Sequence, residues 1–181
     1  MQIITGVARG SKIRTLEGSD TRPTSSKAKA GIFSSIQFDI EGKRVLDLFA
    51  GCGQMGIEAL SRGAKSCVFV DKNKKATRII EENLQNTLKY TAEFVKISKV
   101  LCQDAAMFID MTPDVFDIVF LDPPYAAGLI EQLMPKVSEK LCTGGLLICE
   151  SEHDLCLDGF GLELKKKYKY SRATVAIYYK R

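Results

Sequence analysis

The stretch VLDLFAGCGQMG, residues 45–56, decides the fold that the sequence predicts. It begins as a short apolar run, which is typical of a buried parallel strand. The run ends in a G-x-G-x-x-G pattern at Gly51, Gly53 and Gly56, and residues 54–62 then read as a helix. Glycines between a strand and a helix let the chain turn tightly and let a ligand approach the backbone. The stretch therefore predicts the first strand, loop and helix of an α/β fold, with a ligand at the loop.

Strand-like and helix-like segments alternate along the middle of the chain. Apolar runs typical of strands lie at residues 66–70, 99–102, 116–121 and 146–150. Apolar residues recur at helical spacing in residues 74–88 and 129–141. This alternation predicts an α/β, Rossmann-like sheet whose strands are mainly parallel.

Both ends of the chain depart from that alternation. Residues 162–170 and 173–179 are rich in Tyr, Val and Leu, and the two residues between them force an antiparallel hairpin. Near the N-terminus, residues 2–6 and 12–16 are expected to pair as a small hairpin, and residues 27–38 to form a connecting helix. We therefore expect a single domain, residues 1–181, with a small N-terminal β-hairpin and helix extension and an antiparallel C-terminal hairpin.

The composition is that of an ordinary globular protein, with 45% apolar and 27% charged residues. No apolar run approaches the roughly 20 residues that a membrane helix requires, and residues 1–9 lack the apolar stretch of a secretory signal. His153 is the single histidine and the six cysteines form no CxxC pair, so no metal site is expected. We expect a cytoplasmic monomer that binds no membrane and no metal.

The first thirty residues carry an excess of charge equal to the net charge of the whole chain, which is +4. They hold six basic residues against two acidic ones, Glu17 and Asp20. A polyanion could dock on such a segment, but a solvated mobile arm carries the same kind of charge. Charge alone leaves both interpretations open.

Three acidic residues, Asp47, Asp71 and Asp104, lie at the ends of successive predicted strands. Asp71 lies where a carboxylate can accept hydrogen bonds from ribose hydroxyls, as it would for a dinucleotide or for S-adenosylmethionine. In a dinucleotide site the helix N-terminus faces a pyrophosphate, beside which Asp47 would be poorly placed. A carboxylate there suits a ligand with an ammonium and a sulfonium. The pattern favours S-adenosylmethionine, with ordinary acidic residues at loop edges as the alternative.

The tetrad Asp122, Pro123, Pro124 and Tyr125 follows the predicted strand at residues 116–121. Ligands of open α/β sheets bind at this edge. An exocyclic amine on a nucleobase is a poor nucleophile, because its lone pair is delocalised into the ring. Asp122 and the carbonyl of Pro123, fixed by the proline backbone, can each accept one amine hydrogen and stabilise the charge that develops on nitrogen. Tyr125 offers a ring for base stacking. The tetrad predicts methylation of a base amine, with a merely rigid turn as the alternative.

Taken together, these motifs resemble a known family. The Asp-x-Phe-x-Gly-x-Gly string is similar to the first motif of class I methyltransferases. Over nearly the whole chain the sequence resembles the bacterial 16S rRNA guanine-N2 methyltransferases of the RsmD type. The resemblance is carried by IITGVARGSK at residues 3–12, RPT at 22–24, LDLFAGCG at 46–53, GIEALSRGA at 56–64, DPPY at 122–125 and ESE at 150–152.

The resemblance implies a class I methyltransferase sheet and methyl transfer from S-adenosylmethionine to the N2 amine of one guanine in 16S rRNA, within a small-subunit ribosomal assembly. It implies that residues 41–181 are the catalytic core and that residues 1–40 help to bind RNA. The implied cofactor-binding residues are Asp47, Phe49, Ala50, Gly51, Gly53, Gly56, Asp71, Lys72, Asp104 and Ala105. The implied RNA-binding residues are Arg9, Lys12, Arg22, Thr24, Lys27 and Lys29.

One segment departs from the family pattern, and three other functions stay open. The family usually follows Arg-Pro-Thr with an Asp-Arg-x-Arg-Glu-like helix start, whereas residues 26–30 read SKAKA. Lysine does not reproduce the bidentate phosphate contact of arginine, so this segment bears on RNA contact or target choice.

A DNA adenine-N6 or cytosine-N4 methyltransferase shares the tetrad but normally carries a further base-recognition domain. An NAD-dependent oxidoreductase leaves Asp47 and the tetrad unexplained. A noncatalytic RNA-binding module would keep the fold without methyl transfer.

Overall fold

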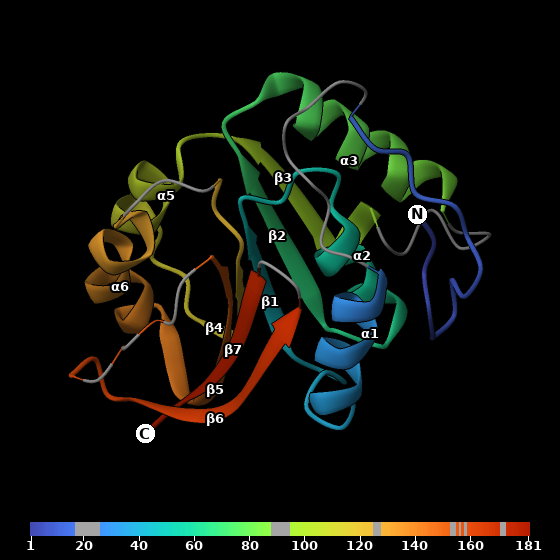
Figure 1. Ribbon diagram of the computed structural model, residues 1–181. Coiled ribbons are helices and arrows are strands. Elements are labelled where there is room, and N and C mark those ends of the chain that lie inside the picture. Colours follow the sequence, from blue (N-terminus) through green and yellow to red (C-terminus); the bar gives the residue numbers. More distant parts are fainter. Residues whose placement is uncertain are drawn as a thin grey trace.

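A computed structural model describes residues 1–16, 26–87, 95–124, 128–152, 155, 157, 159–170 and 173–181. Its helices are α1 (Ser26–Ser35), α2 (Gln54–Ser61), α3 (Lys74–Asn86), α5 (Ala105–Met111) and α6 (Leu129–Glu139). Its strands are β1 (Arg44–Leu48), β2 (Ser66–Asp71), β3 (Ser98–Cys102), β4 (Phe116–Leu121), β5 (Leu141–Ser151), β6 (Leu162–Tyr170) and β7 (Ala173–Lys180). Figure 1 shows how these elements are arranged around the sheet.

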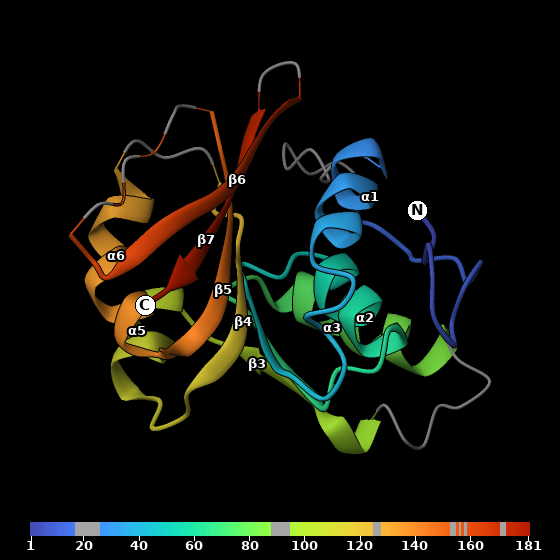
Figure 2. The same ribbon diagram turned by 90° about the horizontal axis from the view of Figure 1, so that it is seen from below.

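The described strands form one sheet in the order β3-β2-β1-β4-β5-β7-β6. The first five are parallel, and β7 runs antiparallel between β5 and β6. Helices α1, α2 and α3 lie on one face of the sheet and α5 and α6 on the other, as Figure 2 shows. The Rossmann-like α/β sheet with its antiparallel C-terminal hairpin is thereby confirmed.

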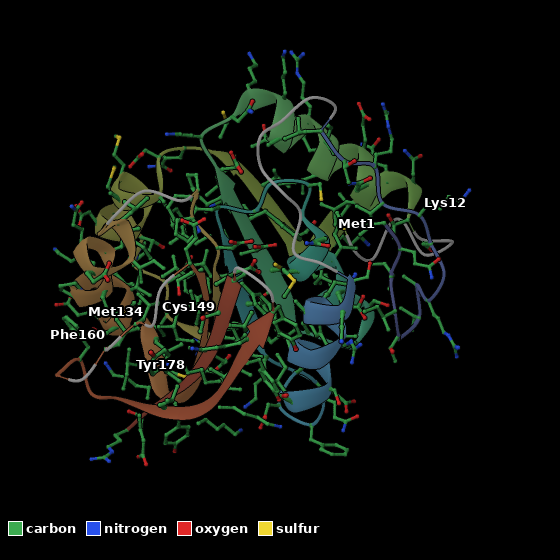
Figure 3. All side chains as sticks on the ribbon, in the orientation of Figure 1. Met1, Lys12, Met134, Cys149, Phe160 and Tyr178 are labelled. Atoms are coloured by element: carbon green, nitrogen blue, oxygen red, sulfur yellow. The ribbon has the colours of Figure 1, made fainter. Side chains whose placement is uncertain are left out.

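Each face of the sheet has its own apolar core, which explains why the parallel strands read as continuous apolar runs. Val45 of β1 packs into the core beneath α1 and α2, whereas its neighbour Leu46 packs into the core beneath α5 and α6. The second core also takes in Met134, Cys149 and Tyr178, which Figure 3 labels on α6, β5 and β7. Both faces of the sheet are therefore buried, and the ends of its strands remain available to form ligand-binding sites.

The N-terminal segment, residues 1–16, folds back on itself in the expected antiparallel direction, but the pairing is shorter than that of residues 2–6 with residues 12–16. Gln2 and Lys12 form an antiparallel bridge, and the N–H groups of Ile3 and Ile13 donate to the carbonyl oxygens of Ser11 and Met1 at 3.0 and 2.8 Å. The segment also bonds to a side chain of α2, because the N–H groups of Ile4 and Thr5 donate to the carboxylate of Glu58 at 2.8 and 3.0 Å. The segment shares the core of the first face, so no separate core divides residues 1–40 from residues 41–181.

Several element boundaries also differ from those expected. Helix α1 ends at Ser35 rather than near residue 38, and α5 was not expected. Strand β5 begins at residue 141 rather than 146, because it passes through an irregularity opposite β4. A Cβ at Gly145 would lie 2.8 Å from the carbonyl oxygen of Cys142, so the irregular part of β5 requires glycine at this position. Among the described residues, no helix is long and apolar enough to cross a membrane.

Strand β6 is the last strand of the sheet on the C-terminal side, and it is rich in lysine. Its lysines are Lys165, Lys166, Lys167 and Lys169, all exposed. At the opposite edge, β3 contains one lysine, Lys99. The two edges of the sheet therefore differ strongly in charge.

Candidate active site

Four acidic residues gather at the edge of the sheet where the parallel strands end. Asp71 ends β2, Asp104 follows β3 and Asp122 follows β4. Asp47 lies one residue before the end of β1, which pairs with both β2 and β4. Because the carboxyl ends of parallel strands meet at one edge, the fold brings together the acidic residues that the sequence predicted there.

The glycine loop between β1 and α2 is held in a strained conformation. Phe49 has a φ of 68°, which a bulky side chain rarely adopts, and Gly51 and Gly53 have φ of 56° and 77°. The N–H groups of Phe49 and Ala50 both donate to the carbonyl oxygen of Val70 at 3.0 Å. Such strain persists only where neighbours fix the backbone, and it is common at ligand sites. Nothing in the sequence signalled the strain at Phe49.

The third glycine of the pattern serves packing. A Cβ at Gly56 would lie 2.2 Å from the ring of Phe69 and 2.6 Å from the sulfur of Cys67. Any larger residue would push α2 away from β2. Gly56 therefore sets how closely the helix that begins at the loop approaches the sheet.

Asp71 fixes the loop from the neighbouring strand. Its Oδ2 accepts the N–H of Gly51 at 2.8 Å, and its Oδ1 accepts the N–H of Asn73 at 2.8 Å. A carboxylate keeps further lone pairs beyond these two bonds, so it can still accept hydrogen bonds from a ligand. Lys72, the next residue, is exposed. Asp71 therefore keeps acceptor capacity for the ribose hydroxyls that it is expected to bind.

Asp47 lies beneath the loop and is almost completely buried, with 4% of its surface exposed. Its Oδ2 accepts the N–H of Gly56 at 2.8 Å. Burial raises the pKa of the Asp47 carboxyl to about 7, the charge of Asp71 adds to the effect, and the Gly56 bond opposes it. A positive charge placed beside this carboxyl would favour its ionised form.

Asp104 has a structural role that the sequence analysis missed. It is the N-cap of α5, where its Oδ1 accepts the N–H groups of Ala106 and Met107 at 2.9 and 3.2 Å. The signal was present, because an aspartate directly before an apolar helical segment is a common N-cap. The side chain of Asp104 is exposed and Ala105 is buried beneath it. Asp104 therefore has a fixed backbone position at this edge of the sheet.

The residues around the glycine loop fit the expected S-adenosylmethionine. A Cβ added at Gly51 would meet no atom within 4 Å, so space remains in front of the loop. The carboxylates of Asp71 and Asp104 are acceptors for hydroxyl and amino groups, and Asp47 places a buried acidic group under the loop. Together they suit a ligand with hydroxyl groups, an amino group and a positive charge.

The candidate catalytic tetrad follows β4, whose last four residues, 118–121, are buried and apolar. Asp122 is half-buried, Pro123 is buried and Pro124 is exposed, whereas Tyr125 lies outside the described residues. The neighbouring Cys149 of β5 is not a candidate nucleophile, because burial, with the charge of Asp122 adding, raises the pKa of its thiol. Burial likewise raises the pKa of Cys52 in the glycine loop. The chemistry at this edge therefore rests on carboxylate and carbonyl oxygens.

The basic residues expected to contact RNA fall into three groups. Arg9, Lys12 and Lys27 are exposed, and Figure 3 shows Lys12 on the N-terminal segment at the periphery of the molecule. Arg22 and Thr24 lie outside the described residues. Lys29 is buried, so the expectation that it contacts RNA was wrong.

Lys29 is buried, with 2% of its surface exposed. Its ammonium lies 3.0 Å from Glu58 Oε2 and donates to the carbonyl oxygen of Gln2 at 2.9 Å. The same carboxylate pairs with Arg62 at 2.9 Å. Lys29 therefore holds α1, α2 and the N-terminal segment together and cannot reach a phosphate.

Comparison with known proteins places this chain among methyltransferases. The family model described as "Conserved hypothetical protein 95" matches residues 1–179. The chain is 36% identical to "Putative rRNA methyltransferase YlbH" of Bacillus subtilis over 188 residues, covering 100% of both chains. It is 35% identical to "Ribosomal RNA small subunit methyltransferase D" of Haemophilus influenzae over 158 residues, covering 85% of this chain and 80% of that protein.

Solved structures agree with the sequence comparison. The fold is similar to that of "Putative methyltransferase yhhF from Escherichia coli", with a TM-score of 0.88 and 26% identity, over 100% of this chain and 98% of the other. That similarity includes the N-terminal residues as well as the sheet, because it covers the whole chain.

Proposed function

The chain belongs to the RsmD family of methyltransferases, and from this premise we propose that it transfers a methyl group from S-adenosylmethionine to the N2 amine of a guanine in 16S rRNA. One observation carries the proposal. The carboxyl groups of Asp47, Asp71 and Asp104, which suit the cofactor, share a sheet edge with Asp122 and Pro123, which suit an amine. The name of the Haemophilus influenzae relative supports small-subunit rRNA as the substrate class.

The residues of the tetrad counter the poor nucleophilicity of a base amine. The carboxylate of Asp122 and the carbonyl of Pro123 accept hydrogen bonds from its two hydrogens and stabilise the positive charge that develops as nitrogen bonds to the methyl group. The bond between methyl and sulfur would break in the same step and leave a neutral thioether, and the Asp122 carboxylate would take up one amine proton. When bound, S-adenosylmethionine supplies an activated methyl group on a sulfonium. Most of the remaining acceleration comes from the rigid β4 end and the glycine loop, which hold the two sites in a fixed relation. Tyr125 is the proposed stacking partner of the base.

RNA binding is assigned to the exposed basic residues of the N-terminal part, Arg9, Lys12 and Lys27, together with Arg22 and Thr24. Lysine at residue 27 acts as a point charge rather than as a bidentate clamp. Electrostatic contacts of this kind give affinity that falls as salt rises. A preassembled small-subunit particle, which presents one unpaired guanine, is the proposed substrate.

The direct test is transfer of labelled methyl from S-adenosylmethionine to small-subunit particles that lack the modification, followed by nucleoside analysis. N2-methylguanosine in the product is the expected result. Label in duplex DNA but not in the particles would replace this proposal with a DNA amino-methyltransferase. No label in either acceptor, with cofactor binding intact, would replace it with a binding role.

The catalytic assignment is tested by the variant Asp122→Ala. We expect it to keep cofactor affinity and to lose methyl transfer by at least about 100-fold, as removal of one transition-state hydrogen-bond partner commonly does. Asp110→Ala, which alters an exposed aspartate on α5, is the matched control and should keep full activity. Unchanged turnover of Asp122→Ala would remove Asp122 from the chemistry.

A further inference from the structure

A buried asparagine on α3 joins the N-terminal segment to the glycine loop. The side chain of Asn83 has 1% of its surface exposed. Its amide nitrogen donates to the carbonyl oxygen of Cys52 at 2.9 Å and to the carbonyl oxygen of Arg14 at 3.0 Å. Its amide oxygen accepts the N–H of Arg14 at 2.9 Å. One planar group therefore holds two parts of the chain that lie far apart in sequence.

The two parts differ in their proposed roles. Cys52 lies between the two glycines of the strained loop that faces the cofactor. Arg14 lies near the end of the N-terminal segment, shortly before the residues that include Arg22 and Thr24. Figure 1 shows α3 between the N-terminal segment and the sheet. Because Asn83 bonds to both, a shift of the Arg14 backbone changes the contact with the Cys52 carbonyl, and the reverse also holds.

The chemistry of the contact requires an amide. A primary amide offers two donors and one acceptor in a plane, and here each of these groups has a backbone partner. A carboxylate of the same shape offers no donor, and a leucine offers neither donor nor acceptor. Because the bond from Asn83 to Cys52 is buried, its loss leaves the Cys52 carbonyl oxygen without its partner, which is costly.

We propose that Asn83 is a positioning residue that couples RNA binding to cofactor binding. RNA bound along the exposed basic side chains of the N-terminal segment restrains Arg14, the Asn83 amide transmits that restraint to the carbonyl of Cys52, and the strained loop is held ready for the cofactor. The coupling is reciprocal, because the effect of one ligand on the affinity for the other must equal the reverse effect. This inference rests on the proposed function.

The coupling can be measured with the full chain. The affinity for S-adenosylhomocysteine, which cannot donate a methyl group, is determined by calorimetry with and without saturating unmodified small-subunit particles. We expect the particles to tighten binding by about 5-fold or more, within the usual range of allosteric coupling. The coupling ratio is the affinity for S-adenosylhomocysteine with particles divided by the affinity without them. In Asn83→Asp this ratio should fall to about 1, because the variant keeps the acceptor for Arg14 but loses both donors.

Two controls separate coupling from damage to the fold. Asn86→Asp makes the same chemical change at an exposed position of the same helix and should keep the ratio of the wild type. Asn83→Ala avoids a buried charge and should also bring the ratio to about 1. A merely structural role would weaken each ligand separately and leave the ratio unchanged.

The outcomes distinguish this inference from the proposed function. Methyl transfer by the wild type together with a ratio of 1, or an unchanged ratio in both Asn83 variants, would overturn the coupling and leave the function intact. Absence of both methyl transfer and particle binding in the wild type would overturn the proposed function, and the coupling with it. A ratio lost in both Asn83 variants and kept in Asn86→Asp supports the inference.

Discussion

The N-terminal segment and the C-terminal hairpin both lie beyond the five parallel strands, but they are attached by opposite means. The N-terminal segment places Ile3, Ala8 and Ile13 in the apolar core, but its backbone is held by polar side chains of the helices. Glu58 alone contacts the N–H groups of Ile4 and Thr5 and the cations of Lys29 and Arg62. The hairpin is held by a ladder in which six residues of β7 pair with β5.

This difference determines how each region responds to a single change. Polar attachment concentrates many contacts on a few buried groups, whose loss leaves other groups unsatisfied. When a region is attached by the hydrogen bonds of a β-ladder and by apolar packing, many residues each contribute a small part of the free energy of unfolding. The predictions below test this contrast, from the largest expected effect to the smallest.

Replacement of Glu58 should have the largest effect. Glu58→Gln removes the charge that compensates the buried Lys29, and we expect the free energy of unfolding to fall by about 3–5 kcal/mol, measured by urea denaturation. The double variant Lys29→Met with Glu58→Gln removes both charges and should recover part of that loss. A loss below about 1 kcal/mol in the single variant would mean that attachment is not concentrated on Glu58.

Ser61 tests the same contrast with a neutral group. Its hydroxyl accepts the N–H of Ala8 at 3.0 Å and donates to the carbonyl oxygen of Thr5 at 2.7 Å. Ser61→Ala should lower the free energy of unfolding by about 1–3 kcal/mol and speed amide exchange at Ala8. Ser138→Ala is the control and should cost less, because the Ser138 hydroxyl donates within its own helix α6, to the carbonyl oxygen of Pro135 at 2.8 Å.

In the hairpin, a change in the apolar core should cost less than either change above. Ile177 of β7 is buried with 1% of its surface exposed. Ile177→Val removes one methylene from the core beneath α1, and we expect a loss of about 0.5–1.5 kcal/mol by urea denaturation. A loss larger than that of Ser61→Ala would contradict the idea that the hairpin distributes its stability.

The smallest effect is expected at the surface contact between β6 and the chain after α1. Lys165 pairs with Asp39 at 3.3 Å, and both side chains are more than 40% exposed. Lys165→Ala should change the free energy of unfolding by at most about 0.5 kcal/mol, less at high salt, because water and ions screen such pairs. A loss above about 1 kcal/mol would show that hairpin attachment also depends on a polar contact.

The same contrast explains which parts of the fold could be predicted from the sequence. The mostly apolar run at residues 116–121 coincides with β4, because a parallel strand buried on both faces is mainly apolar. Its one charged residue, Asp117, is half-buried and pairs with Arg44. The hairpin followed from a two-residue connection, which is local information. The attachment of the N-terminal segment to α2 could not be predicted, since its partner Glu58 lies more than 50 residues away.

The candidate site shows the same limit. The positions of Asp71, Asp104 and Asp122 followed from where strands end, and the structure brings them to one edge. The wrong expectation for Lys29 could have been avoided, because it shares a helical face with Ile32, Phe33 and Ile36, all buried. The contacts of Asn83 had no such signal, since its partners are backbone groups that any sequence offers.

The lysines of β6 have a consequence for self-association. An outermost strand presents unpaired backbone groups and invites a second copy of the chain to extend the sheet. If two copies met through β6, the four lysines at residues 165, 166, 167 and 169 would face the same four, and like charges opposed across strands repel. Growth of the sheet is therefore opposed on this side by electrostatic repulsion, whereas β3 on the other side opposes it with one lysine.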